Sequence, residues 1–237
     1  MRKQQAGFTL IEIAIVLVII GLLLGGVLKG QELITSARVR NLISTQDGIK
    51  AAYFGFLDRF KALPGDYTLA TTNIAGVGTV VTCGTSGNGN GDGRILAAAN
   101  EHILAWDHLS KAGFMNGSYT CAAAESTATT PNNPYGIRMQ LVYDTVYGQT
   151  GGVTGSSNRH NLKTGPQIPV DIIAEVDRKI DDGLPYTGGF QNSLYAGGGT
   201  APTEGAAASP ACTSAIAVTG TWNAINGSNN CGGASLF

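Results

Sequence analysis

A single carboxylate inside a long apolar run is the first residue of this chain whose position indicates specific chemistry. Glu12 lies within residues 8–28, a stretch in which Thr9 is the other polar side chain. A charged side chain costs about 2.5–3.5 kcal/mol at the centre of a membrane-spanning helix, and less near the interface. An acid at such a position therefore indicates a functional site with a specific partner.

The segment before the apolar run differs from an ordinary secretory signal. Residues 1–7 contain Arg2 and Lys3 and no hydrophobic stretch of their own. A secretory signal carries its apolar region before the cleavage site, whereas here the apolar region follows the candidate site. A cut after Gly7 would leave the whole run on the mature protein, with Glu12 about one helical turn from the new amino terminus.

A second candidate site is a loop in which oxygen-bearing side chains alternate with glycine. In residues 88–93 the sequence reads NGNGDG. This alternation lets a tight turn direct Asn88, Asn90 and Asp92 towards one point, as in the first half of an EF-hand calcium loop. The loop therefore predicts a hard-cation site, with calcium as the candidate ion.

The rest of the calcium pattern is incomplete. The carbonyl of Arg94 could supply a fourth ligand, but Ala99 occupies the place of the usual twelfth-position glutamate. The nearest carboxylate after it is Glu101. The pattern is thus compatible with a weak calcium site and equally with a turn that holds no ion.

Another acidic turn closes a predicted helix later in the chain. Asp177, Asp181 and Asp182 lie at the carboxyl end of that helix, where negative charge opposes the helix dipole. We expect compensation by Arg178, by Lys179 or by an ion, although most turns of this kind are simply solvated.

Signatures of catalysis are missing from the sequence. His102, His108 and His160 lack the HExxH spacing of zinc proteases, and there is no GxSxG nucleophile elbow. The glycine-rich run at 87–93 lacks the Lys-Ser/Thr ending of a phosphate-binding loop. We expect neither an enzyme nor an organic cofactor.

The four cysteines indicate disulfides more than metal binding. None of them forms a CxxC pair, so the usual zinc and thioredoxin spacings are absent. An even number fits two disulfides if the domain lies outside the cytoplasm, and three connectivities are possible. We favour Cys83–Cys121 with Cys212–Cys231, because each bond closes a modest loop; free buried thiols are the alternative.

One long helix must position the amino-terminal residues. Its first part, 8–28, matches a bilayer core of about 30 Å, and the basic residues before it place the leader in the cytoplasm and the remainder outside. Its second part, 29–63, carries an apolar stripe with spacings of three, four or seven. Pro64-Gly65 should end it. The stripe comprises Val39, Leu42, Ile49, Tyr53, Phe56, Phe60 and Leu63.

Residues 64–237 form the predicted extracytoplasmic head. Only 13% of the chain is charged, and the net charge is −1, which favours a loop-rich domain without a surface for nucleic acid. Within the head we expect helices over 95–111 and 169–180 and strands over 137–147 and 215–222.

The sequence GFTLIE before an unbroken apolar run resembles the class III leader of type IV prepilins and type II secretion pseudopilins. The resemblance implies cleavage between Gly7 and Phe8 by a prepilin peptidase, because a side chain at Gly7 would obstruct the enzyme. It also implies N-methylation of Phe8. The implied fold is pilin-like α+β, in which a long amino-terminal helix packs on a small, loop-rich head containing β-structure.

The resemblance also implies a role for Glu12. After cleavage, Glu12 of one subunit can pair with the α-amine of Phe8 of a neighbour, so that each charge offsets the desolvation of the other. Such a pair fixes the axial register of a helical filament. The implied partners are the inner membrane, the peptidase, other pilin or pseudopilin subunits, and an assembly platform with its ATPase.

The length of the head and the absence of a proline from the helix bear on the kind of filament. Major type IV pilins often carry a proline in the lower half of the helix and commonly have shorter heads. No proline lies between Gly7 and Pro64 here, which favours a pseudopilin or minor pilin. The alternative is a membrane-anchored module that recognises a surface, a substrate or DNA and does not polymerise.

Overall fold

The structure is a computed structural model. Contacts within it divide the chain into two compact units, Met1–Arg38 and Val39–Phe237. The residues that the structure describes are 9–78, 83–148, 157–205, 210–225 and 227–237.

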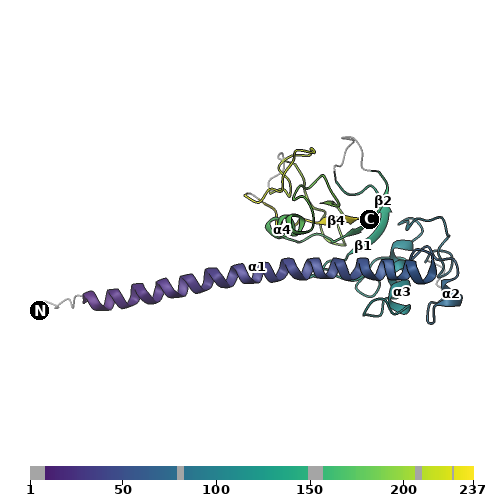
Figure 1. The fold of residues 1–237 in the computed structure, drawn as a ribbon, viewed down its shortest axis with the longest axis horizontal. Coiled ribbons are helices and arrows are strands. Elements are labelled where there is room, and N and C mark those ends of the chain that lie inside the picture. Colours follow the sequence, from purple (N-terminus) through teal and green to yellow (C-terminus); the bar gives the residue numbers. More distant parts are fainter. Residues whose placement is uncertain (1–8, 79–82, 149–156, 206–209, 226) are drawn as a thin grey trace, which may run out of the picture. The chain divides into compact units, whose positions relative to one another are not determined.

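Helix α1, Leu10–Phe60, contributes to both units (Figure 1). Its first part is long and apolar enough to cross a membrane. The helix was predicted to continue to residue 63, and this is wrong: Lys61 adopts a left-handed φ of 53°, and its N–H donates to the carbonyl of Leu57 at 2.9 Å. The helix therefore stops before Pro64 rather than at it, since a left-handed residue cannot continue the α-helical path.

From Val39 onwards one face of α1 is buried in the head, as the apolar stripe predicts. Phe60 and Leu63, at the end of the stripe, are partly buried against the core. Gln46 fills a gap in the stripe, and its Oε1 accepts a hydrogen bond from the hydroxyl of Ser235. The fully enclosed members of the stripe are Val39, Leu42, Ile49, Tyr53 and Phe56.

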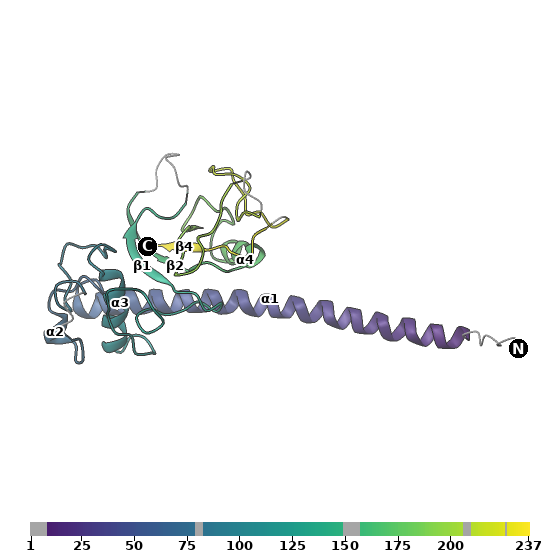
Figure 2. The ribbon, with the colours of Figure 1, turned by 180° about the vertical axis from the view of Figure 1, so that it is seen from behind.

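Two large apolar clusters form most of the core of the head. One gathers Val39 and Leu42 of α1 with α4, Val170–Ile180. The other gathers the later part of α1 with α3, Glu101–Lys111. Accordingly, α3 and the short α2, Ala70–Asn73, lie beside the carboxyl end of α1 in both views of the ribbon (Figures 1 and 2).

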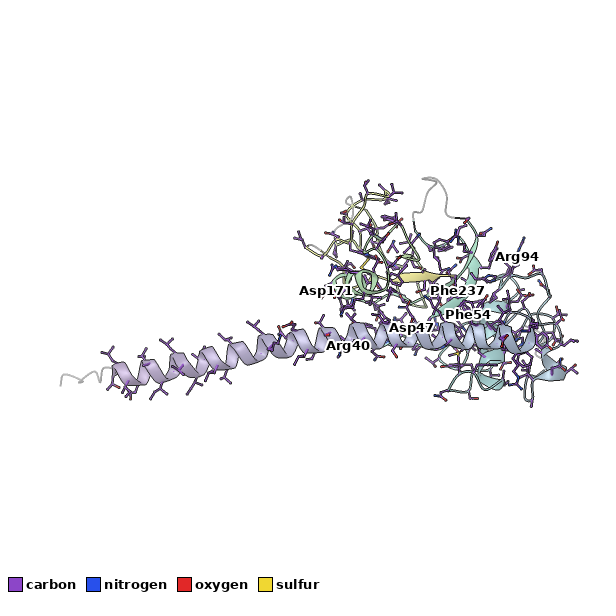
Figure 3. All side chains as sticks on the ribbon, viewed as in Figure 1. Arg40, Asp47, Phe54, Arg94, Asp171 and Phe237 are labelled. Carbon is purple, nitrogen blue, oxygen red and sulfur yellow. A yellow bond between two sulfur atoms is a disulfide. The ribbon has the colours of Figure 1, made fainter. Side chains whose placement is uncertain are left out.

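A four-stranded antiparallel sheet completes the head, in the order β1-β2-β4-β3. Its centre is apolar, with Leu141 opposite Leu162 and both enclosed. The last residue, Phe237, lies near Phe54 of α1, with ring centroids 6.0 Å apart (Figure 3). The predicted α+β, pilin-like fold is confirmed. The strands are β1, Gln140–Asp144; β2, Arg159–Lys163; β3, Phe190–Asn192; and β4, Gly233–Leu236.

The two predicted helices of the head are present, one of them shorter than expected. Helix α4 matches the prediction, with Pro169 as its N-cap. Helix α3 begins at Glu101 instead of residue 95, because Asn100 adopts a left-handed φ of 56° that starts the helix afresh. It ends before Gly113, whose φ of 81° is typical of the residue after a helix.

The two predicted strands had different outcomes. The strand over 137–147 is present in its central part as β1, but the strand over 215–222 is wrong. There the chain reverses, and the N–H of Gly220 donates to the carbonyl of Ala217 at 2.7 Å. A β-carbon at Gly220 would lie 2.4 Å from the carbonyl of Ala215, so the turn requires glycine and leaves one isolated bridge, between Thr213 and Trp222.

Both favoured disulfides are present. Cys83 is bonded to Cys121, and Cys212 is bonded to Cys231. The first bond lies beside α3 in a small apolar cluster with Leu104. The second closes the C-terminal loop against the cluster that contains α4, so each bond holds irregular chain onto one of the helices of the head.

Candidate functional site

Glu12 caps the first turn of α1. The backbone N–H and the hydroxyl of Thr9 each donate to Oε2 of Glu12 at 2.8 Å, and the N–H of Glu12 faces the hydroxyl of Thr9 at 3.4 Å. This is the reciprocal capping box of the pattern Thr-x-x-Glu, which satisfies N–H groups that have no partner within the helix. The spacing signals this cap in the sequence, but the sequence-based interpretation assigned Glu12 to a neighbouring subunit alone.

The cap uses only one oxygen of the carboxylate. Both Thr9 bonds end on Oε2, and from residue 9 onwards no described donor is bonded to Oε1. Glu12 is exposed, and no side chain from Thr9 to Arg38 is buried. A cation from outside the helix can therefore reach this carboxylate without breaking the cap. Gly7 and Phe8, the predicted cleavage site, lie outside the described residues.

The predicted calcium loop is wrapped around a carboxylate that the sequence did not identify, Asp66. Its Oδ1 accepts the N–H groups of Gly91 and Asp92 at 2.6 and 3.1 Å, and its Oδ2 accepts that of Gly93 at 2.8 Å. One ligand oxygen from each of Asp66, Asp92 and Glu101 lies within 4.8 Å of the other two. The structure thus brings two predicted ligands together with a new one.

The two asparagines of that loop are engaged elsewhere. Oδ1 of Asn88 accepts the N–H and the hydroxyl of Thr71, at 2.9 and 3.2 Å. Oδ1 of Asn90 accepts the N–H of Asp92, and a carboxylate oxygen of Asp92 accepts the N–H of Arg94, both at 2.9 Å. The side chains therefore stabilise the turn itself, and Asn88 is not directed at the carboxylates.

Glu101 is held against the loop by backbone groups. Its two oxygens accept the N–H groups of Asn90 and Leu96, at 3.3 and 3.0 Å. Burial raises the pKa of Asp66 and of Glu101, while these N–H groups favour the charged forms. The carboxylates of this cluster already accept hydrogen bonds from backbone N–H groups, so the loop is held in place without an ion. Calcium binding at this loop stays a prediction.

The family comparison concerns the amino terminus. The model of the prokaryotic N-terminal methylation motif matches residues 2–28. This is the amino terminus of a type IV prepilin-like protein. No curated protein and no solved structure matches the chain.

The prepilin-like motif identifies how the chain is processed. A prepilin peptidase processes subunits of this kind, and their partners are pilin-type subunits. The apolar first part of α1 fits anchoring in the inner membrane. Glu12 and its Thr9 cap lie within the matched residues, which links the geometry at the start of α1 to the family motif.

The head of this prepilin-like protein also contains a buried polar network. Glu125 accepts hydrogen bonds from the amide of Gln140 at 2.9 Å and from the hydroxyl of Tyr195. His102 Nε2 lies 3.3 Å from the same carboxylate. Although burial raises the pKa of Glu125, these partners outweigh it and hold the pKa below its usual value. The arrangement connects α3, β1 and a distant loop and stabilises the fold.

Proposed function

We propose that this chain is a structural subunit, and not an enzyme, that enters a helical filament through its amino-terminal helix. The filament is a type II secretion pseudopilus or a type IV pilus, and the subunit is a pseudopilin or minor pilin. The observation that supports this most strongly is Glu12, capped through one oxygen only, at the exposed start of a helix whose side chains up to Arg38 are not buried.

The apolar surface of α1 requires an environment outside the chain. Leu10 is 92% exposed, and the large side chains that follow it up to Leu28 are about half exposed or more. In the membrane, lipid covers them. Outside the membrane they would face water at a cost of roughly 0.8 kcal/mol per CH₂ group, so an extracted subunit needs neighbouring apolar helices around it.

The free oxygen of Glu12 provides the register for this packing. A cut before Phe8 creates an α-amine, and the amine of a neighbouring subunit can approach Oε1 while Thr9 retains Oε2. Loss of one partner from a buried charge pair typically costs about 3–5 kcal/mol, because the other charge stays buried and unpaired. A misplaced subunit would pay the same penalty, which favours a single register.

Two features support an inner-membrane protein with a periplasmic head. Arg2 and Lys3 precede the apolar segment, which favours a cytoplasmic leader. The disulfides Cys83–Cys121 and Cys212–Cys231 require an oxidising compartment for the head. Extraction from the membrane would then depend on an assembly platform and its ATPase.

The test replaces Glu12 and compares a second acid of the same helix. Glu32 is exposed and forms an ion pair with Lys29 at 2.7 Å, so Glu32→Ala is a matched control. We expect Glu12→Ala to lower the amount of protein in sheared, pelleted filaments at least tenfold at equal membrane levels. Glu32→Ala should assemble normally. A normal filament yield for Glu12→Ala would contradict the proposal and favour a non-polymerising membrane-anchored module.

A further inference from the structure

The turn that follows α4 gathers three carboxylates. One oxygen from each of Asp177, Asp181 and Asp182 lies within 4.8 Å of the other two. Asp177 is fully enclosed, with 0% exposure, whereas Asp181 is half-buried and Asp182 is exposed. The cluster therefore extends from the interior of the head to its surface, where an ion can enter.

The buried carboxylate of this cluster lacks a partner for one oxygen. Oδ2 of Asp177 accepts the indole N–H of Trp222 at 2.7 Å, but Oδ1 is buried and has no hydrogen-bond partner among the described residues. The N–H of Gly183 is near enough to favour the charged form of Asp177, yet no hydrogen bond of adequate geometry reaches Oδ1. A buried carboxylate oxygen in this state is costly.

The other two carboxylates are held in place by the loop. Oδ2 of Asp181 accepts the N–H of Phe190 at 2.8 Å. Oδ1 of Asp182 accepts the N–H of Leu184 at 2.8 Å, and its Oδ2 accepts the hydroxyl of Thr187. The ligand geometry is thus preorganised, which lowers the entropic cost of binding an ion.

The basic residues nearby in the sequence do not neutralise the cluster. Arg178 and Lys179 both form ion pairs with Glu175, on the preceding turn of α4. Lys50 of α1 attracts Asp181 electrostatically, but it forms no ion pair with Asp181 within 4.0 Å. Of the three expected sources of compensation, Arg178 and Lys179 are thus paired with Glu175 and an ion is left. Negative charge stays at a helix end where the dipole already favours a cation.

We propose that Asp177, Asp181 and Asp182 bind a calcium ion, with water completing its coordination. Carboxylate oxygens are ligands for hard cations, and calcium accepts flexible geometry at about 2.3–2.6 Å. Two ligands of one calcium ion can therefore be up to about 5 Å apart, so carboxylate oxygens that lie within 4.8 Å of one another can share a single ion.

The bound ion would link three segments of the head. Asp177 belongs to α4, the N–H bonded to Asp181 belongs to β3, and the indole bonded to Asp177 lies within the loop closed by Cys212–Cys231. Calcium would thus join the end of α4 to the C-terminal disulfide loop, and its binding would change the fluorescence of Trp222.

The test titrates the full chain in detergent with calcium chloride, after treatment with EGTA. Calorimetry measures the number of ions and their affinity, and tryptophan fluorescence gives a local signal that Trp222→Phe should remove while Trp106 remains. We expect Asp182→Asn, which changes an exposed side chain and preserves its size, to weaken this binding at least tenfold. Asp177→Asn should do the same if it folds.

Two controls make the result specific to this turn. Asp171 is an exposed acid on the same helix (Figure 3), so Asp171→Asn should leave affinity unchanged. Asp92→Asn alters the other acidic loop and should leave the Trp222 signal unchanged. The proposal is overturned if calcium does not bind, if Asp182→Asn binds it as tightly as the unchanged chain, or if Asp92→Asn alone abolishes the Trp222 signal.

Discussion

Helix α1 presents two large apolar side chains in opposite surroundings. Leu22 is 73% exposed, whereas Phe56, on the same helix, is 0% exposed. Phe56 is enclosed by aromatic residues of the head, including Phe60 with ring centroids 4.5 Å apart and Phe114 at 6.0 Å. The head thus covers its apolar surface within one chain, and the unit up to Arg38 does not, which is the pattern expected of a surface that lipid or other apolar helices cover.

Polar groups show the same contrast. In the head, the carboxylate of Asp66 accepts three backbone N–H groups, and the buried Lys163 forms an ion pair with Asp144. At the start of α1, Thr9 is the one residue in the described part of the chain to which Glu12 is bonded. The comparison teaches that the polar groups of the head find their partners within the chain, whereas Glu12 has an oxygen left for a partner from outside, as the proposed assembly requires.

The largest effect expected from this contrast comes from two matched substitutions on α1. Phe56→Ala removes a fully buried ring and should lower the free energy of unfolding of the head by about 3–5 kcal/mol. Leu22→Ala should leave that free energy unchanged. Denaturant unfolding of the full chain in detergent, followed by tryptophan fluorescence, measures both. Equal destabilisation by the two variants would show that the difference in burial between Leu22 and Phe56 does not affect the free energy of unfolding of the head.

A smaller effect should come from His108, a buried ring in the head. Its Nδ1 accepts the N–H of Gly65 at 3.0 Å, which places the proton on Nε2, 3.1 Å from the carbonyl of Gly87. Burial lowers the pKa of His108 to about 4. Below pH about 6.5 the unfolded chain binds a proton that the native ring accepts only near pH 4. The contribution of His108 to the free energy of unfolding therefore falls by about 2 kcal/mol at pH 5.

The measurement must separate His108 from a group of opposite sign. Burial raises the pKa of Asp177 to about 7. Above pH about 3.9 the native chain therefore binds a proton that the unfolded chain has lost. Because of this, the contribution of Asp177 to the free energy of unfolding rises as the pH falls. The difference in unfolding free energy between the unchanged chain and His108→Gln, measured at pH 7 and pH 5, isolates His108. A difference that does not shrink towards pH 5 would contradict the assigned neutral state.

Local patterns in the sequence predicted the elements that depend on neighbouring residues. The stripe from Val39 to Phe56, the helix after Pro169 and the position of Glu12 all follow from short spacings. The disulfide pairing followed from loop lengths. These features need no knowledge of distant contacts, which explains why they were accessible before the structure.

The features that the sequence did not predict depend on residues that are far apart in the chain. Asp66 receives N–H groups from residues 91–93, and the sequence near it shows only a turn after Pro64. Strand β2 includes Lys163, which is buried because Asp144 of β1 pairs with it. A pattern of alternating apolar and polar residues would assign a lysine to the exposed face, so alternation alone does not predict this strand. The reversal at Gly220 likewise overrides an alternating pattern that favoured a strand.

Cysteine cross-linking between copies tests the central claim, that the exposed helix is covered by other subunits. The four native cysteines are all in disulfides, so single cysteines introduced from Leu10 to Leu28 would be the only free thiols. The account predicts disulfide-linked dimers at several of these positions in assembling cells, and their loss when Glu12→Ala is added. Absence of dimers at every position, or dimers that persist with Glu12→Ala, would contradict it.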